Sequence, residues 1–222
     1  MNKFYEQPIF LQWLEAILLL IAGFYPALLI IELSYSQPLF ELLFFIYLPI
    51  GQFALTPFFR LSGIYKYYSP MILGYMANEK QIDLHSGGSF DYLFVMRKYK
   101  SGIECRHRLL TYHLEGLLNI IAQIENEAIP NSITIVGTSY FFNERTINRL
   151  GFEQEKPSLF YRINLFVNLI DLTWMYSVAQ GHFEIPKVWK ANKAQIEGGK
   201  LIEKKEIIQY LYENMSARVK KS

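Results

Sequence analysis

The sequence predicts an α/β protein, with an N-terminal two-helix transmembrane hairpin followed by a mixed α/β cytoplasmic domain that ends in helices. Three observations predict this class. Two long apolar runs stand near the start of the 222-residue chain, most charged residues follow residue 59, and strand-like and helical patterns alternate after that point. Charged residues make up 19% of the chain, whereas ordinary soluble domains carry about 25%. A uniformly soluble enzyme and a disordered charged chain are therefore excluded, and the single Cys105 excludes a disulfide scaffold.

The first two elements are the apolar runs at residues 9–31 and 39–59. Each is long enough to cross a hydrocarbon core of about 30 Å as a helix. A short segment separates them, so we expect antiparallel neighbours. A cleaved signal peptide is the alternative for the first run, but the run is too long and a second one follows directly. Two buried helices of a soluble core are the other alternative, although helices that are apolar on all sides are uncommon outside membranes.

The distribution of charge predicts the orientation of the hairpin. Residues 1–59 hold one of the 22 cations, Lys3, and four of the 20 anions, so residues 60–222 carry a net charge of +5. By the positive-inside rule both termini lie in the cytoplasm of a bacterial-type inner membrane. We expect residues 60–70 to be a juxtamembrane linker and residues 71–222 to be one cytoplasmic domain beside anionic headgroups.

The first half of this domain shows strand and helix signals in turn. Residues 82–96 are expected to form one strand, or two around the Ser86-Gly87-Gly88-Ser89 turn. Residues 105–126 have the three-and-four spacing of a helix, and residues 133–142 are typical of a buried strand. Asn143 is expected to cap a short helix that runs to Leu150 and is ended by Gly151.

The second half begins with a strand expected at Ser158. An amphipathic helix is expected next, at about residues 164–180. This stretch is not expected to be a third membrane span, because polar residues interrupt its apolar sequence. Asn164, Asn168 and Asp171 are spaced i, i+4, i+7, which puts them on one face of that helix. A turn at Gly198-Gly199 then leads to a terminal helix at residues 203–219.

Two groups of residues suggest chemistry. His85, with Ser86 and Ser89 nearby, is a candidate general base or nucleophile site, with a polar turn between strands as the alternative. Cys105, His107 and His113 resemble metal ligands in type, but their spacings of six and eight do not share one helical face, so no metal site is predicted.

A basic cluster is a third candidate site. It suits phosphates of a nucleotide or coenzyme, or anionic lipid. Nucleic acid is not expected as a partner, because the domain's excess is only about five charges and the chain is membrane-bound. The cluster comprises Arg97, Lys98, Lys100, Arg106 and Arg108.

The stretch ITIVGTSYFFNERTINRLGF at residues 133–152 resembles the second half of the GNAT acetyltransferase fold, in which a helix ends in an "lGF" turn before the next strand. The resemblance covers residues 82–159 and implies an N-acyltransferase that uses acyl-coenzyme A. It also implies that the coenzyme pyrophosphate meets the start of the 105–126 helix. The residues expected to hold the coenzyme are Gly102, Cys105, Arg106, Arg108 and Asn143, and His85 or Tyr140 is expected to act as base or acid.

Three departures from that family keep a second hypothesis open. The family's glycine-rich loop is represented only by Gly102, its frequent tyrosine acid is Ile147 here, and residues 70–82 leave no room for its N-terminal strands. We also expect its closing strand pair to be replaced by the helix at 164–180. The alternative is a non-catalytic ligand-sensing or interaction module that acts through homo-oligomerisation of the hairpin, and a plain structural anchor is also compatible with the sequence.

Overall fold

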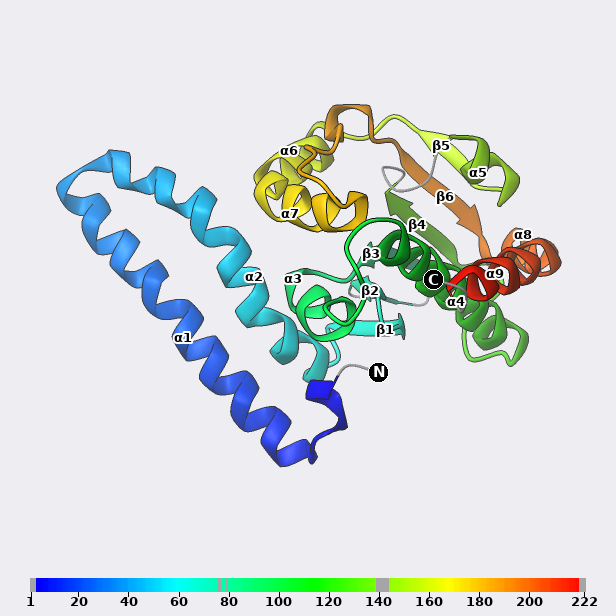
Figure 1. The fold of residues 1–222 in the computed structure, drawn as a ribbon, viewed down its shortest axis with the longest axis horizontal. Helices are drawn as coiled ribbons and strands as arrows, with labels where there is room; N and C mark the ends of the chain where they lie inside the picture. Colours follow the sequence, from blue (N-terminus) through cyan, green and yellow to red (C-terminus); the bar gives the residue numbers. More distant parts are fainter. Residues whose placement is uncertain (1–2, 76, 79, 139–143, 220–222) are drawn as a thin grey trace.

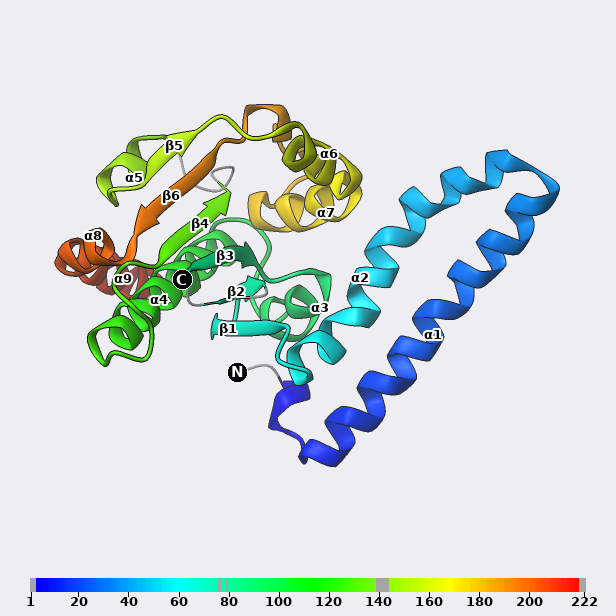
Figure 2. The ribbon, with the colours of Figure 1, turned by 180° about the vertical axis from the view of Figure 1, so that it is seen from behind.

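The computed structural model describes residues 3–75, 77–78, 80–138 and 144–219, and Figure 1 shows its arrangement. Two long N-terminal helices form one arm of the molecule. A six-stranded sheet with helices packed around it forms the rest. The same two parts are seen from behind in Figure 2.

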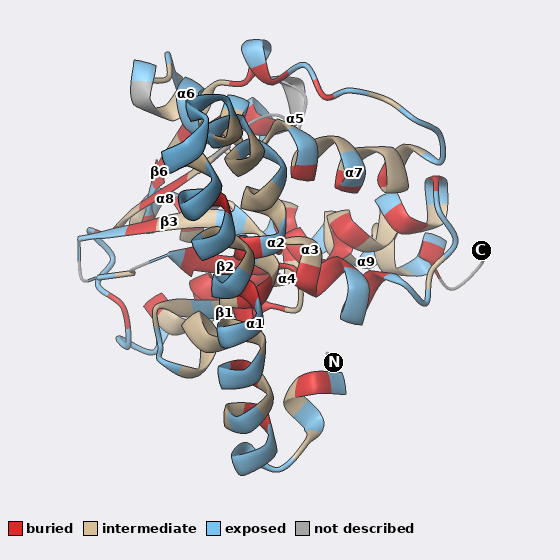
Figure 3. Cartoon of the chain, turned by 90° about the vertical axis from the view of Figure 1, so that its left-hand side faces the viewer, coloured by how far each residue is buried: buried red, intermediate tan, exposed pale blue. Residues whose placement is uncertain are grey.

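The arm consists of α1 (Ile9–Ser36) and α2 (Leu43–Leu61), preceded by the 3-10 turn η1 (Lys3–Glu6) and joined by the 3-10 turn η2 (Pro38–Leu42). Both helices are long and apolar enough to cross a membrane. Only 17% and 22% of their most apolar windows are buried, and Figure 3 shows exposed residues along most of α1. These are not the buried core helices of a soluble fold.

The two helices approach each other closely at Gly23. A Cβ atom on Gly23 would lie 2.5 Å from the Cβ of Ala54, so only glycine fits. The Tyr47 hydroxyl also donates a hydrogen bond of 2.8 Å to the Gly23 carbonyl oxygen. Small residues at a helix contact allow such close packing of apolar helices.

A cluster of aromatic rings and one cation fixes the arm to the sheet. The Arg60 guanidinium, in the last turn of α2, lies 3.6 Å from the ring centre of Tyr5 and 4.3 Å from that of Tyr67. Phe53 of α2 packs on Phe90, with ring centres 5.2 Å apart. The position of α2 against the rest of the domain is therefore set by packing and by cation–π contacts.

The sheet has the strand order β1-β2-β3-β4-β6-β5. Strands β3 and β4 are parallel, with pairs from Gln81↔Thr134 to Leu84↔Gly137, and the other neighbours are antiparallel. His85 and Ser86 are the last two residues of β3. The strands are β1 (Tyr65–Ser69), β2 (Ile72–Tyr75), β3 (Gln81–Ser86), β4 (Thr134–Thr138), β5 (Glu153–Glu155) and β6 (Lys193–Glu197).

Helix α4 (Ile103–Glu125) links the parallel strands and packs against the sheet together with α8 (Gly198–Glu203) and α9 (Lys205–Val219). Their main core includes the fully buried side chains of Ile82, Ile120, Ile121, Ile135, Leu201 and Ile208. Helix α6 (Leu159–Val167) leads into α7 (Leu169–Gln180), which lies beside α2 (Figures 1 and 2) and contacts both α2 and α4.

Several predicted elements are confirmed. The helix expected at 105–126 is α4, and the buried strand expected from residue 133 begins as β4. The short helix expected after Asn143 is α5 (Glu144–Arg149), and Gly151 follows it with a φ of +82°. Asn143 itself, like residues 139–142, lies outside the described residues.

Two predicted strand segments are wrong because they form helices. Residues 89–96 form α3 (Ser89–Asp91) and a π-helical turn, η3 (Tyr92–Met96), whose buried side chains include Phe90 and Val95. The strand expected at Ser158 is α6, because the Ser158 hydroxyl accepts a hydrogen bond from the Tyr161 amide and caps the helix.

The helix expected at 164–180 is two helices, α6 and α7, which meet at Asn168. The expected linker at 60–70 contains the end of α2 and strand β1, while β2 occupies residues that were expected to leave no room for strands. The strand pair β5–β6 is present rather than replaced by the 164–180 helix. Gly198-Gly199 begins α8 directly after β6, where a Cβ on Gly198 would lie 2.9 Å from the Asn131 carbonyl oxygen.

Candidate functional site

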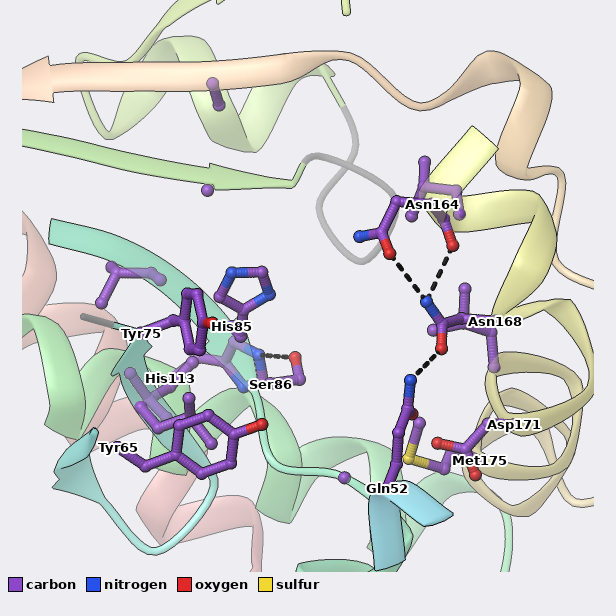
Figure 4. Close-up of a pocket in the computed structure, with 18 of the residues that line it drawn as sticks. Gln52, Tyr65, Tyr75, His85, Ser86, His113, Asn164, Asn168, Asp171 and Met175 are labelled. Carbon is purple, nitrogen blue, oxygen red and sulfur yellow. Dashed lines mark hydrogen bonds between the residues drawn. The ribbon is translucent and has the colours of Figure 1, made fainter. Parts of the chain in front are cut away.

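A pocket of about 620 Å³ lies between α2, the sheet and helices α6–α7 (Figure 4). No Lys or Arg contributes to its walls among the residues that the structure describes. Its apolar lining includes Leu73, Leu84, Leu117, Ile147, Phe152, Leu165, Leu172 and Met175. Its polar lining comprises Gln52, Thr56, Tyr65, Tyr75, His85, Ser86, Ser89, His113, Asn164, Asn168 and Asp171.

His85 stands on the sheet side of the pocket, at the end of β3. Its imidazole meets the ring of Tyr75 edge to face, with ring centres 6.4 Å apart. The imidazole is accessible from the pocket but surrounded by protein. Desolvation lowers the pKa of His85 below its usual 6.5, and the nearby Asp83 carboxylate opposes this shift. The ring is therefore neutral near pH 7 and can accept a proton.

Beside it, Ser86 and His113 form a hydrogen-bonded pair. The His113 Nδ1 lies 2.7 Å from the Leu109 carbonyl oxygen, so Nδ1 carries the ring proton and Nε2 accepts. The Ser86 hydroxyl donates to Nε2 at 2.9 Å. Burial lowers the pKa of His113 to about 4, which keeps this imidazole neutral and makes it a weak base.

The opposite side of the pocket is formed by amides and a carboxylate on α6–α7. Gln52 of α2 donates a hydrogen bond to the side-chain oxygen of Asn168. The Asn168 side chain in turn donates to the Asn164 carbonyl oxygen at 2.8 Å and to its side-chain oxygen at 3.0 Å. Asn164, Asn168 and Asp171 all line the pocket, so the shared face predicted from their spacing is confirmed.

Asp171 is the acidic residue of this wall. It accepts a hydrogen bond from the Ser89 hydroxyl. Burial raises the pKa of Asp171, and the hydrogen bond from Ser89 opposes that rise. Figure 4 shows these α6–α7 side chains facing the group formed by His85, Ser86 and His113 across open space.

The residues predicted to hold the coenzyme pyrophosphate lie outside the pocket, where α7 ends against the start of α4. The Gly102 amide donates to the Val178 carbonyl oxygen at 2.9 Å, and the Cys105 amide donates to the Lys100 carbonyl oxygen at 3.2 Å. A Cβ on Gly102 would lie 3.6 Å from the Cα of Gly181. In this arrangement the amides are engaged within the protein, so they do not fit a pyrophosphate there.

The two predicted arginines are also engaged elsewhere. Arg106 donates to the Gln180 side chain at 3.2 Å, and the Arg108 guanidinium lies 4.7 Å from the ring centre of Tyr99. Neither lines the pocket. Tyr140 and Asn143 lie outside the described residues, so His85 is the predicted site residue that the structure brings to this pocket among those described.

The described part of the chain shows no cluster of metal-ligating side chains. No group of three or more His, Cys, Asp or Glu side chains there is placed to hold a metal ion. Cys105 is buried in an apolar cluster with Met96 and Leu109, and burial raises the pKa of its thiol to about 11. The Nε2 atom of His113 accepts a hydrogen bond from Ser86, and this ring belongs to no group of metal ligands among the described residues.

Sequence reasoning missed the pairing of Ser86 with His113. His113 was weighed only as a metal ligand. It follows Leu109 by four residues and precedes Leu117 by four, which places it on the buried face of α4. A polar residue within an apolar helical stripe was the available signal, because a buried imidazole requires hydrogen-bond partners.

Comparisons with protein families, with curated proteins and with solved structures found no match. What this chain does is therefore inferred from its own pocket. The pocket combines apolar walls, a neutral imidazole and a set of amide and hydroxyl groups. Such a lining suits the apolar chain and polar head of a neutral or acylated ligand.

Proposed function

We propose that this protein is a membrane-anchored acyltransferase that takes the acyl group of an acyl-coenzyme A and transfers it to an amine near the membrane. The observation that carries the proposal is the pocket, in which apolar walls reach His85 and which lies directly beside the apolar helix α2. An acyl chain fills such a cavity by hydrophobic burial, at roughly 25 cal/mol for each Å² removed from water.

Helices α1 and α2 cross a bacterial-type inner membrane in this proposal, with both termini in the cytoplasm. Their length and exposed apolar surface support it. The net charge of +5 on residues 60–222 then faces anionic headgroups. A homo-oligomer formed through the hairpin is compatible with this arrangement.

The chain order of the domain supports the GNAT resemblance as part of the same proposal. Two parallel strands, β3 and β4, are joined by α4, and α5 ends at Arg149, with Gly151 between it and strand β5. The antiparallel pair β5–β6 then closes the sheet. His85, at the end of the first parallel strand, is the residue that this arrangement offers for proton transfer.

The proposed reaction is the attack of a neutral amine on the thioester carbonyl. The C–N bond forms as the C–S bond breaks, and the imidazole of His85 accepts the proton that the amine loses. The imidazolium of His85 then gives this proton to the departing thiolate, so that the free thiol and the amide are the products and His85 is neutral again. A neutral imidazole is required in the first step, and the lowered pKa of His85 supplies it at neutral pH.

The proposal places only the acyl chain and the thioester in the pocket. The amides of Gly102 and Cys105 are engaged, so no pyrophosphate is assigned to the start of α4. A donor that needed those amides would first have to displace the end of α7 at Gly181.

A transfer assay tests this function. The full chain is placed in nanodiscs that contain phosphatidylethanolamine, and palmitoyl-coenzyme A with a labelled acyl group is added. We expect free thiol and labelled amide in equal amounts. Absence of thiol release with donors from acetyl to palmitoyl, with phosphatidylethanolamine or free ethanolamine as the amine, would refute it.

A second function is favoured by one contact, the hydrogen bond from Gln52 of α2 to Asn168. It joins the hairpin directly to a wall of the pocket. A non-catalytic module that senses an acyl ligand would use this link to change the packing or oligomeric state of the hairpin. Saturable binding of palmitoyl-coenzyme A without turnover, together with a ligand-dependent change in cross-linked oligomers, would favour this function over the first.

A further inference from the structure

Helices α6 and α7 carry a row of exposed apolar side chains that points away from the pocket. Within each helix these residues follow each other at intervals of three or four, so each helix carries its apolar side chains on one face. The side chain of Phe166, for example, is 63% exposed. The row comprises Leu159, Ile163, Phe166, Ile170 and Trp174.

The segment after α7 also exposes large apolar side chains. Phe183 is 77% exposed and Trp189 is 64% exposed, with exposed Ile185 between them. Val188 packs with Leu165 of α6 in one buried cluster, which holds this segment against α6 and α7. Soluble monomers rarely expose so many large apolar side chains together, and such surfaces mark protein or membrane contacts.

Exposed cations are interspersed with these apolar residues, namely Arg162, Lys187 and Lys190. Large apolar rings alternating with Lys and Arg are typical of segments that lie in the headgroup region of an anionic bilayer. Tryptophan is also enriched at that depth. This composition favours a lipid surface over a second copy of the chain.

The position of α7 relative to α2 supports the same occupant. Gln52, which bonds to Asn168, lies nine residues before the end of α2 at Leu61. At the rise of an α-helix this is about 14 Å along the axis. The start of α7 therefore lies beside α2 rather than beyond its end, so a bilayer whose cytoplasmic surface lies at the level of Gln52 also reaches α6–α7.

From this we infer that α6, α7 and residues 183–190 lie in the cytoplasmic interface of the bilayer that α2 crosses, and that the pocket takes the apolar chain of a bilayer-resident amphiphile between α2 and α6–α7. The inference rests on the proposed membrane position of the hairpin. The substrate is then an amphiphile whose apolar chain passes directly from the lipid into the pocket. Its polar head meets Gln52, Asn164 and Asn168.

Fluorescence quenching by brominated lipids tests this placement. The chain has three tryptophans, Trp13 in α1, Trp174 in α7 and Trp189. Single-tryptophan forms of the full chain are made with the other two changed to Phe, and reconstituted in phosphatidylcholine–phosphatidylglycerol vesicles with and without brominated chains. As a matched control, Tyr210→Trp is made with all three native tryptophans changed to Phe, because Tyr210 is exposed on the distant helix α9.

We expect brominated lipid to reduce the emission of Trp174 and of Trp189 at least twofold, and to leave the Tyr210→Trp control within about a tenth of its value. Equal quenching of Trp174, Trp189 and the control overturns the inference. Shielding of Trp174 that is independent of bromine and accompanied by a dimer also overturns it, in favour of a second copy.

The Trp13-only form tests the membrane position of the hairpin separately from that of α6 and α7. If Trp13 is quenched and Trp174 and Trp189 are not, the hairpin is in the bilayer and this inference alone fails. If Trp13 is not quenched, the membrane position of the hairpin fails as well. Trp13 packs on Phe58, so Trp13→Phe can lower the thermal midpoint. In that case the Trp174-only and Trp189-only forms are made with Trp13→Tyr instead.

Discussion

The Ser86 hydroxyl donates a hydrogen bond to Nε2 of His113, whose other ring nitrogen is held by the Leu109 carbonyl oxygen. This pair joins the end of β3 to the middle of α4 at the edge of the pocket. Because the ring is buried and both nitrogens are engaged, its neutral form is part of the folded structure.

The first prediction concerns the pH dependence of stability. The pKa of His113 is about 4 in the folded protein and near 6.5 when the chain unfolds, so the unfolded state binds more protons between these values. Stability is therefore lost as pH falls from 6.5 to 4, by about 3 kcal/mol from this residue. Thermal midpoints of wild type and His113→Gln across this range measure it. A wild-type curve parallel to that of His113→Gln would contradict the assignment.

The second prediction concerns His85. If its imidazole accepts the proton of the attacking amine, His85→Gln lowers the transfer rate about 100-fold or more, while binding of the acyl donor changes little. His107→Gln is the control, because His107 lies outside the pocket. The ionisation of His85 should add to the wild-type pH profile a rise in rate whose midpoint lies below 6.5, because its pKa is lowered, and this rise should be absent from His85→Gln. A His85→Gln variant with full activity removes this residue from the mechanism.

The third prediction concerns the link between the arm and the pocket wall. Gln52→Leu removes the hydrogen bond to Asn168, which at a typical net value is worth about 1 kcal/mol. We expect faster hydrogen–deuterium exchange in the first turn of α7 and unchanged exchange in α9. Asn168→Leu should produce the same pattern, and the double variant no further change. Unaltered exchange at α7 would mean that packing alone positions this helix.

The fourth prediction concerns the packing of α1 on α2. Gly23→Ala forces a Cβ to within 2.5 Å of the Ala54 Cβ, so the helices must separate, at a cost of about 1–3 kcal/mol. Adding Ala54→Gly removes the clash. The thermal midpoint of the double variant should exceed that of Gly23→Ala alone. If the second change lowers the midpoint further, the two helices do not meet at these residues.

Much of the fold could be predicted from local patterns. The lengths of the apolar runs predict α1 and α2, and the three-and-four spacing after Cys105 predicts α4. The i, i+4, i+7 spacing of Asn164, Asn168 and Asp171 placed three polar groups on one face, and that face lines the pocket. Each of these features depends on neighbours within a few residues.

The missed features depend on contacts between distant residues. Strands β1 and β2 are short and rich in tyrosine, and next to an apolar run such residues are equally typical of a membrane interface. Ser86 and His113 are 27 residues apart and meet only because α4 packs across the end of β3. The Gly102 amide is occupied because α7 supplies the Val178 carbonyl oxygen, and no pattern around Gly102 indicates the position of α7.

Binding of palmitoyl-coenzyme A to two variants at Gly137 shows whether an acyl chain occupies the pocket. This residue of β4 lines the pocket, and among the residues that the structure describes a Cβ there would meet none closer than Leu84 at 3.9 Å, which leaves room for a side chain. Gly137→Leu fills part of the cavity, whereas Gly137→Ala adds a single methyl group. If the acyl chain lies in this pocket, Gly137→Leu weakens binding of palmitoyl-coenzyme A at least tenfold and Gly137→Ala binds like wild type. A folded Gly137→Leu protein that binds palmitoyl-coenzyme A as tightly as wild type would contradict the claim.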